Sequence, residues 1–294
     1  MKRPELLAPA GGTAALHAAV MNGADAVYLG LPAFNARRSA DNFTLESFEE
    51  ACAYAHGRGV RVYVTMNTVV LPGEMVDALE LARRAWLAGA DAFIVQDLGL
   101  AEALRRALPE ARLHCSTQMN IHNAAGLRAA ARLGAERVTL ARELSIDEVA
   151  ALAAEAQALD MEVESFVHGA LCVCYSGQCF MSSMIGGRSA NRGACAQACR
   201  LPYELACEGE ALPAEGEHLL SPADLCAVDR LADLVRASVA SFKVEGRMKS
   251  PEYVGAVVGV YRRALDQVLA EGTAQATADE RTTLASVFSR GFTT

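Results

Sequence analysis

Long hydrophobic runs are absent from this sequence. No stretch reaches the roughly 18 consecutive apolar residues expected of a membrane span, and the opening MKRPELLAPAGG lacks the apolar core of a signal peptide. Both absences argue against a membrane-bound or secreted protein. We therefore expect a cytoplasmic protein with no membrane partner.

Two familiar hydrolase motifs and an excess of positive charge are also missing. The sequence has no G-x-S-x-G nucleophile elbow and no H-E-x-x-H zinc motif, so no familiar proteolytic apparatus is visible. The formal net charge is -8. This charge gives no whole-molecule attraction to nucleic acid, although a local basic surface could still bind phosphates.

Acidic residues are missing locally, from Ser165 to Tyr203. This segment carries four cysteines in the order C-x6-C-x15-C-x3-C: Cys172, Cys179, Cys195 and Cys199. In a reducing cytosol, thiolates grouped in this way are more often metal or cluster ligands than disulfide partners. The pattern therefore predicts a bound inorganic cofactor.

Zinc and an iron–sulfur cluster are the two cofactors to weigh. Structural zinc sites use close C-x2-4-C pairs, and only Cys195 and Cys199 are that close. Ligation of a cluster by four thiolates tolerates wider spacing. Arg188, Arg192 and Arg200 would offset the negative charge of a thiolate-bound cluster. Reduced thiols without any cofactor are the remaining interpretation.

Cys174 and Cys226 are expected to lie outside the ligand set. Cys174 is two residues from Cys172, so in an extended segment its side chain points the other way. Cys226 falls in a predicted helix that begins with SPADLC, where Ser221 is a candidate N-cap.

Eight short apolar runs are typical of parallel strands that are covered on both faces. They are residues 5–9, 26–30, 60–66, 92–96, 112–116, 137–141, 162–168 and 241–246. Amphipathic stretches that predict helices alternate with them, at residues 13–22, 44–57, 74–88, 99–107, 123–133, 145–159 and 222–236. The phrase x-G-A-D/E recurs at Gly23, Gly89 and Gly134, which indicates turns from helix to strand.

The alternation favours a (β/α)8 TIM-type barrel over an open doubly wound sheet, although periodicity alone does not show closure. All 294 residues fit one barrel domain. The gap between strands seven and eight is long, and residues 169–221 are interpreted as a cysteine-rich insertion with a β-hairpin over 203–221. A last helix is predicted at Pro251–Glu271. The closing SVFSRGFTT resembles the start of another element, so we expect the N-terminal part of a longer protein.

Polar residues follow the predicted strands at their carboxyl ends, where barrel enzymes assemble their sites. Arg142 and Arg247 could clamp a carboxylate or phosphate in two-pronged fashion, with Glu143 and Glu245 as possible structural ion-pair partners. His168 could act as a proton donor, a ligand or a buried structural residue. The candidate catalytic residues are Arg142, His168, Lys243, Glu245 and Arg247.

Several segments together resemble the U32 peptidase-like family. They are ESFVHGALCVCYSGQCFMSS at 164–183, IGGRSANRGACAQACRLPYEL, LLSPADLC, SFKVEGRMKSPEYV and the opening ELLAPAG and ADAVYLG. The resemblance implies a barrel-like domain and, in several branches, a [4Fe-4S] cluster on cysteines that match Cys172, Cys179, Cys195 and Cys199. Family members commonly continue beyond a phrase like the one at 288–293.

Those branches act in oxygen-independent hydroxylation, either of bases in tRNA or ribosomal RNA or of the ubiquinone ring. Prephenate is implied as oxygen donor in the RNA branch, while other members carry a protease or collagenase label. We therefore expect an enzyme that hydroxylates an RNA base and takes RNA and a small anionic co-substrate as partners. A peptidase and a noncatalytic iron–sulfur scaffold are the alternatives.

Overall fold

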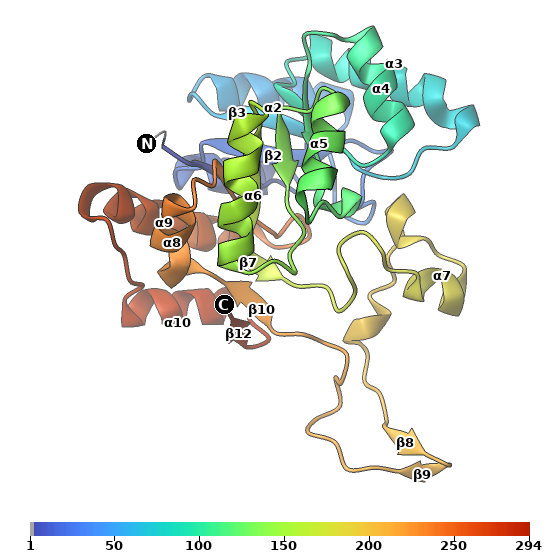
Figure 1. The fold of residues 1–294 in the computed structure, drawn as a ribbon, viewed down its shortest axis with the longest axis vertical. Coiled ribbons are helices and arrows are strands. Elements are labelled where there is room, and N and C mark those ends of the chain that lie inside the picture. The colour runs from blue at the N-terminus through green and yellow to red at the C-terminus, as the bar shows by residue number, and fades with distance from the viewer. Residues whose placement is uncertain (1–2) are drawn as a thin grey trace.

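Eight parallel strands close into a barrel in the computed structural model, which describes residues 3–294 (Figure 1). Neighbouring strands pair in chain order, and the last strand, β11, pairs with both β7 and β1. This closure confirms the (β/α)8 TIM-type prediction and excludes the open doubly wound sheet. The barrel strands are β1 Glu5–Pro9, β2 Ala26–Gly30, β3 Arg61–Met66, β4 Ala92–Val95, β5 Arg112–Cys115, β6 Arg137–Thr139, β7 Glu162–Ala170 and β11 Ser241–Val244.

Helices connect the strands on the outside of the barrel, close to the predicted ranges. They are α1 Thr13–Met21, α2 Leu45–His56, α3 Met75–Leu87, α4 Leu98–Ala107, α5 Ala124–Arg132, α6 Ile146–Ala158, α8 Leu231–Arg236 and α9 Pro251–Glu271. The hydroxyls of Thr44 and Ser145 accept hydrogen bonds from the first turns of α2 and α6 and so fix where these helices start. Gly23, Gly89 and Gly134 have positive φ angles, as the turn phrase predicts.

The two faces of the barrel strands have different chemistry. Outward side chains such as Val27, Val62 and Phe93 pack under the helices in the main hydrophobic core. The inward side chains include a smaller apolar group that contains Tyr28 and Tyr63. Charged residues are buried inside as well, as described below for the site.

The segment after β7 leaves the barrel and returns at β10 Asp224–Cys226, which pairs antiparallel with the end of β7. The predicted helix at 222–236 is therefore wrong in its first half, and helix α8 begins only at Leu231. The overhanging end of β7 offers unpaired backbone groups, and strand pairing with them replaces helix formation. Ser221 is no N-cap, because a strand and not a helix follows it; its Oγ accepts from Nη1 of Arg200 at 2.6 Å.

An arm extends from the barrel between residues 201 and 221 (Figure 1). Its tip is a hairpin of β8 Ala206–Cys207 and β9 Glu210–Ala211, turned by Glu208 and Gly209 with positive φ. The predicted hairpin exists, but its strands are shorter than the 203–221 pattern indicates. At the base of the arm, the backbone N–H of Tyr203 donates to the carbonyl oxygen of Glu217 at 2.7 Å.

The remaining elements are short or lie after the barrel. Among the described residues, 3-10 helices cover Pro72–Glu74, Thr117–Met119, Ala190–Arg192, Ala198–Arg200 and Val228–Arg230, and the insertion also carries α7 Met181–Gly186. After α9 come α10 Ala278–Val287 and β12 Phe292–Thr293, which pairs parallel with β10. Across residues 3–294, no helix combines the length and apolarity needed to span a bilayer.

Candidate active site at the barrel mouth

Two guanidinium groups, that of the buried Arg247 and that of the half-buried Arg142, lie at the carboxyl end of the barrel without a carboxylate partner. Nη1 of Arg247 donates to Thr65 Oγ1 at 2.8 Å and lies 3.4 Å from Asn35 Oδ1. Nη1 of Arg142 donates to the carbonyl of Ala170 at 2.9 Å. Within residues 3–294 neither forms an ion pair. Both positive charges are therefore available to an anionic ligand.

Burial is the main cause of the altered acidity of both guanidinium groups. It lowers the pKa of Arg247 to about 10 and lowers the pKa of Arg142 as well. Both groups remain charged at neutral pH. A ligand carboxylate placed beside them would replace part of the hydration that burial removes, which favours binding of an anion at this position.

Lys243 lies deeper in the barrel and is paired. Its Nζ donates to Glu164 Oε1 at 2.8 Å and lies 4.6 Å from the ring centroid of Tyr28 and 5.5 Å from that of Phe166. Burial lowers the pKa of Lys243, and Glu164 opposes that change. Burial would raise the pKa of Glu164, but the charges of Lys243 and Arg137 bring it below its ordinary value.

Arg37 and Glu245 form a second pair at the mouth, with 3.4 Å between Arg37 Nη2 and Glu245 Oε1. Burial opposes the charge of Arg37, but the Glu245 carboxylate raises its pKa overall. The predicted residues Arg142, Lys243, Glu245 and Arg247 thus belong to one charged group at the mouth.

His168 faces helix α9 instead of the barrel interior. Its Nδ1 lies 3.3 Å from the hydroxyl of Tyr261, and its ring is 5.4 Å from the Tyr261 ring. The pairing of β7 with β11 shifts at this point, because Phe166 pairs with Lys243 and His168 with Val244. This bulge in β7 turns His168 to the outer face. Burial lowers its pKa to about 4, so it is neutral at pH 7.

Three residues inside the barrel that the sequence reasoning did not single out are Tyr28, Glu164 and Arg137, of which Arg137 stands at the amino end of β6 and pairs with Glu5. Tyr28 donates its hydroxyl to the carbonyl of Val244 at 2.9 Å. Glu164 also accepts from Thr139 Oγ1 at 2.7 Å. The sequence did offer a signal for Glu164, which is a charged residue in a largely apolar strand. Alternate side chains of β7 point into the barrel, so a charge at such a position faces the interior.

The cysteine-rich insertion is held against the loops that follow the barrel strands. The hydroxyl of Ser176 donates to Glu143 Oε1 at 3.0 Å and accepts from the backbone N–H of Arg142 at 3.2 Å. Gly177 lies against the backbone of Gln118, where an added Cβ would be 2.0 Å from the carbonyl oxygen. Glu143 thus binds the insertion and does not pair with Arg142.

A second set of contacts holds the part of the insertion between Cys179 and Cys195. Arg192 makes two hydrogen bonds of 2.6 Å to the carboxylate of Glu74. The backbone N–H of Val69 donates to the carbonyl of Asn191 at 2.9 Å. Gly193 lies so close to Asn35 that a Cβ would be 2.3 Å from its carbonyl oxygen. These contacts place the insertion over the barrel mouth.

The four predicted ligand thiols are free and lie within electrostatic reach of one another. Burial raises the pKa of Cys199, Arg200 lowers it, and Cys172, Cys195 and Cys179 each raise it further. Cys172 acts to raise the pKa of Arg142, and Cys195 acts to raise the pKa of Arg37. These two thiols therefore lie close to charged residues of the barrel mouth. In the part of the chain that the structure describes, no three His, Cys, Asp or Glu side chains form a group ready to hold a metal ion.

The two cysteines expected outside the set have different surroundings. Cys226 is buried in β10, with its Sγ 4.0 Å from the Tyr261 hydroxyl. Cys174 lies nearer to the four predicted ligands. Burial raises its pKa, and the charges of Cys179 and Cys172 raise this pKa further. Its Sγ donates to the carbonyl of Gln178 at 3.3 Å.

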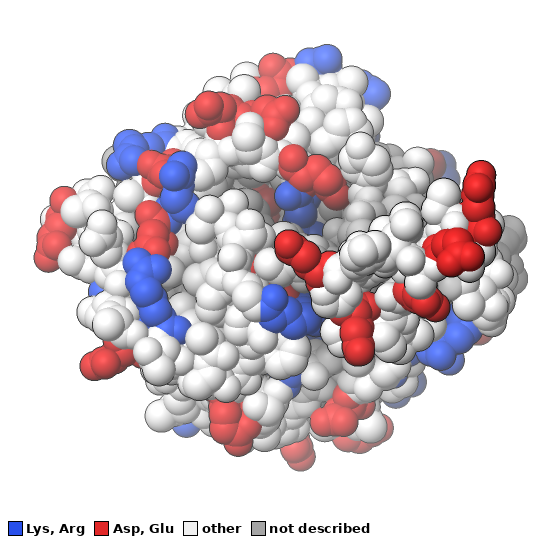
Figure 2. Space-filling model, turned by 90° about the horizontal axis from the view of Figure 1, so that it is seen from below, with Lys and Arg blue, Asp and Glu red and all other residues white. Residues whose placement is uncertain are grey.

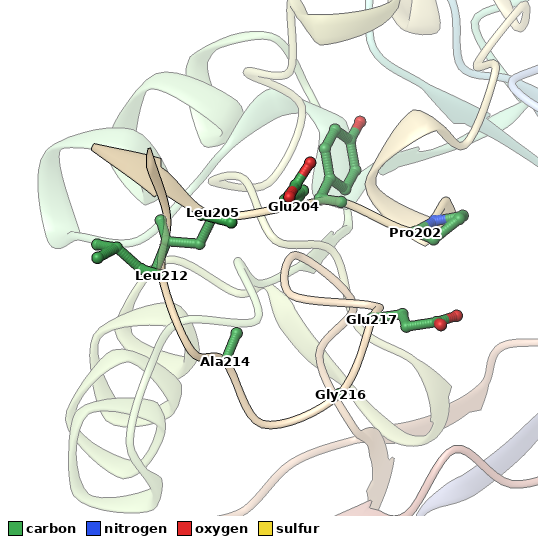
Figure 3. Close-up of a pocket in the computed structure, with 9 residues that line it drawn as sticks. Pro202, Glu204, Leu205, Leu212, Ala214, Gly216 and Glu217 are labelled. Atoms are coloured by element: carbon green, nitrogen blue, oxygen red, sulfur yellow. The ribbon is translucent and has the colours of Figure 1, made fainter. Parts of the chain in front are cut away.

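Two hollows lie near the insertion and the mouth. One, of about 410 Å³, is an open hollow on the arm, and its lining includes Leu205, Leu212 and Glu217 (Figure 3). It contains none of the predicted site residues. The other, of about 220 Å³, lies between the start of α1 and the segment after β11, and Arg247 and Lys249 help to line it.

Basic and acidic side chains are interspersed on the face seen from below the view of Figure 1, and no broad basic surface covers it (Figure 2). This agrees with the net charge of -8. Any attraction to a polyanion on this face therefore comes from local groups.

The model of peptidase family U32 matches residues 11–294. The chain belongs to this family. A 23S rRNA 5-hydroxycytidine synthase of Escherichia coli is 42% identical over 92% of this chain and 40% of its own length. A tRNA hydroxylation protein of Bacillus subtilis is 39% identical over 92% of this chain and 65% of its own length. The chain thus spans less than two thirds of both relatives.

Other U32 relatives carry protease names. A collagenase of Porphyromonas gingivalis is 37% identical over 98% of this chain and 72% of its own length. Among solved structures, a U32 peptidase has 16% identity and a TM-score of 0.50, covering 84% of this chain and 93% of its own. That likeness supports the fold. The predicted family is confirmed, and both predicted activity classes occur among the names.

Proposed function

We propose that this U32 chain is the barrel region of an iron–sulfur enzyme that hydroxylates a base in tRNA or ribosomal RNA without using molecular oxygen. The observation that carries the proposal is the placement of four free thiols over a barrel mouth with two unpaired guanidinium groups. The names of two RNA-modifying relatives agree with it.

The donor set fits an iron–sulfur cluster in its chemistry. Cys172, Cys179, Cys195 and Cys199 would hold a [4Fe-4S] cluster, which supplies one-electron chemistry when bound. All four are free thiols that reach the surface, and Arg200 lies close enough to lower the pKa of Cys199. A cluster is wider than a single ion and takes thiolates that are farther apart. Zinc is the alternative that metal analysis separates from a cluster.

The chain's own side chains supply binding and orientation. Arg247 and Arg142 would bind the carboxylates of a small anionic co-substrate such as prephenate, because neither charge has a carboxylate partner and that of Arg247 is buried. Arg37 and Glu245 hold each other at the edge of the same site. Lys243 would face the co-substrate from below, with its charge balanced by Glu164. His168 is neutral and turned away, which favours a structural role.

Mass spectrometry of RNA nucleosides from a deletion strain tests the reaction. We expect one hydroxylated nucleoside to disappear and to return with the wild-type gene, but not with Cys179→Ala or Arg247→Gln. Cys207→Ala is the matched control, since Cys207 is an exposed cysteine on the arm and outside the ligand set. Unchanged RNA in the deletion strain would reject the proposal, and full rescue by Cys179→Ala and Arg247→Gln would favour the scaffold alternative.

Iron and sulfide analysis after anaerobic purification tests the cofactor separately. We expect iron and sulfide in the wild type and in Cys207→Ala, and a large loss in Cys179→Ala. Colourless protein with stoichiometric zinc would rule out the cluster.

A peptidase is the second candidate, supported by the protease and collagenase names of relatives. Cleavage of a peptide library that is lost in Arg247→Gln would support it. Cleavage that survives every substitution at the mouth would point to a contaminating protease.

A further inference from the structure

Two aromatic side chains on the insertion are exposed where a packed core would bury them. Tyr175 is 69% exposed and Phe180 is 59% exposed, and both lie on the loop that carries Cys172 and Cys179. Their exposure follows from how the loop is held. The hydroxyl of Ser176 donates to Glu143, and Gly177 lies against the backbone of Gln118, so this part of the loop faces the barrel. The neighbouring side chain of Tyr175 faces solvent.

The segment that carries these rings has charged side chains of one sign, although Glu143 and Glu74 of the barrel loops bind its Ser176 and Arg192. Residues 165–203 contain three arginines and no acidic residue, in a chain whose net charge is -8. The exposed Arg188 follows α7, and the exposed Arg38 packs its stem along Gly193. Within residues 3–294 no carboxylate forms an ion pair with either of these two arginines. Both charges are thus free for an external anion.

We propose that Tyr175 and Phe180 form a stacking platform for unpaired bases of an RNA strand, with Arg38 and Arg188 binding its phosphates. Single-stranded nucleic acid is bound in this way, by base stacking on exposed aromatic rings beside cationic groups, and not by a broad basic surface. A partner protein would use the exposed rings but would have no need of a segment that carries arginines and no acidic residue of its own. The inference rests on the proposed function and names how its substrate is held.

The platform would bring a base next to the thiol-bearing loop. The ring positions are adjacent in sequence to Cys174 and Cys179, and the loop itself is anchored over the mouth. A base that stacks there lies out of any duplex, which an enzyme needs when it modifies a base atom. The platform therefore selects loops and unpaired segments over duplex RNA.

Binding of the intact protein to a fluorescent single-stranded RNA oligomer, measured by anisotropy, tests the platform without any turnover. We expect Tyr175→Ala and Phe180→Ala each to weaken binding roughly 5- to 100-fold, the range for loss of one stacked base. Tyr175→Phe should bind like the wild type because its ring is kept. Leu87→Ala is the control, since Leu87 is equally exposed but lies on α3.

The salt dependence tests the arginines. Arg38→Gln and Arg188→Gln should each lower the slope of log affinity against log salt by about 0.7, the value for one phosphate contact on a single strand. An inorganic polyphosphate probe should compete weakly, because it has no bases to stack.

Three results would overturn the platform. They are unchanged RNA affinity in Tyr175→Ala and Phe180→Ala, equal competition by polyphosphate, or tighter binding of duplex than of single strands. Unchanged affinity together with a nucleoside missing from the deletion strain would leave the proposed function standing and assign the aromatic surface to a protein contact. Absence of RNA binding by the wild type, with unchanged RNA in the deletion strain, would remove both.

Discussion

At the scale of single residues, the barrel interior holds charges that are buried in pairs. Arg137 donates to Glu5, and Lys243 donates to Glu164, with all four side chains almost fully buried. Such pairs contribute little net stability, but removal of one partner leaves an uncompensated buried charge. Arg142 and Arg247 are exceptions to this pairing, and this is the reason to assign them to ligand binding.

His168 gives a prediction on pH. Its folded pKa of about 4 is below the ordinary value of 6.5, so the unfolded chain binds a proton more readily between these values. The stability from its burial is complete above pH 6.5 and is lost as the pH falls toward 4, amounting to roughly 2 kcal/mol by pH 5. Asp224, which raises this pKa, is the charged group that acts on it.

Urea unfolding at pH 7.5 and pH 5 measures this effect. We expect wild type to lose about 2 kcal/mol more than His168→Gln over that interval. His114, also buried with a lowered pKa, is unchanged in both proteins and cancels in the comparison. Equal losses in the two proteins would show that His168 is charged or exposed in the folded state.

At the scale of elements, the insertion depends on close backbone contacts with the loops at the mouth. Gly177 has φ +72° and lies on the backbone of Gln118, where a Cβ has no room. The barrel strands do not need this contact, because they pair with one another and pack under their own helices. The insertion should therefore come loose without loss of the barrel.

Gly177→Ala tests this independence by limited proteolysis. We expect cleavage within residues 172–200 to become several-fold faster, while the circular dichroism of the barrel remains that of the wild type. Gly186→Ala is the matched control, because a Cβ at Gly186 meets open space and its φ is not positive. Equal protease resistance of the two variants would contradict the proposed role of the Gly177 contact.

At the scale of the whole molecule, different contacts stabilise the barrel core and the thiol-bearing insertion. The main core lies between the strands and the outer helices and includes none of Cys172, Cys179, Cys195 and Cys199. A bound cluster would hold the loop with Cys172 and Cys179 together with the segment that carries Cys195 and Cys199. It would add nothing to the packing of the barrel.

Removal of iron from the loaded protein by a chelator tests this division. We expect the helical and strand signal in circular dichroism to be retained and protease cleavage to appear between residues 172 and 200. Untreated protein that passed through the same buffer is the control. Unfolding of the whole barrel on chelation would show that the cofactor supports the core.

Local patterns in the sequence were enough for most of the barrel. Strands such as 26–30 and helices such as 251–271 occur where predicted, because continuous apolar runs and capping residues act through neighbouring positions. The cysteine set, Arg142, Lys243, Glu245 and Arg247 could be named for the same reason. Each stands at the end of a strand or in an unusual local composition.

What only the tertiary structure decided depends on contacts between distant segments. Closure required β11 to pair with β1, and the end of β7 drew Asp224–Cys226 out of the predicted helix. A bulge against β11 turned His168 outward. The sequence by itself determined which segments form strands and helices, since that preference is local. The barrel's closure decided which side chains meet, because pairing partners far apart in the chain compete for the same backbone hydrogen bonds.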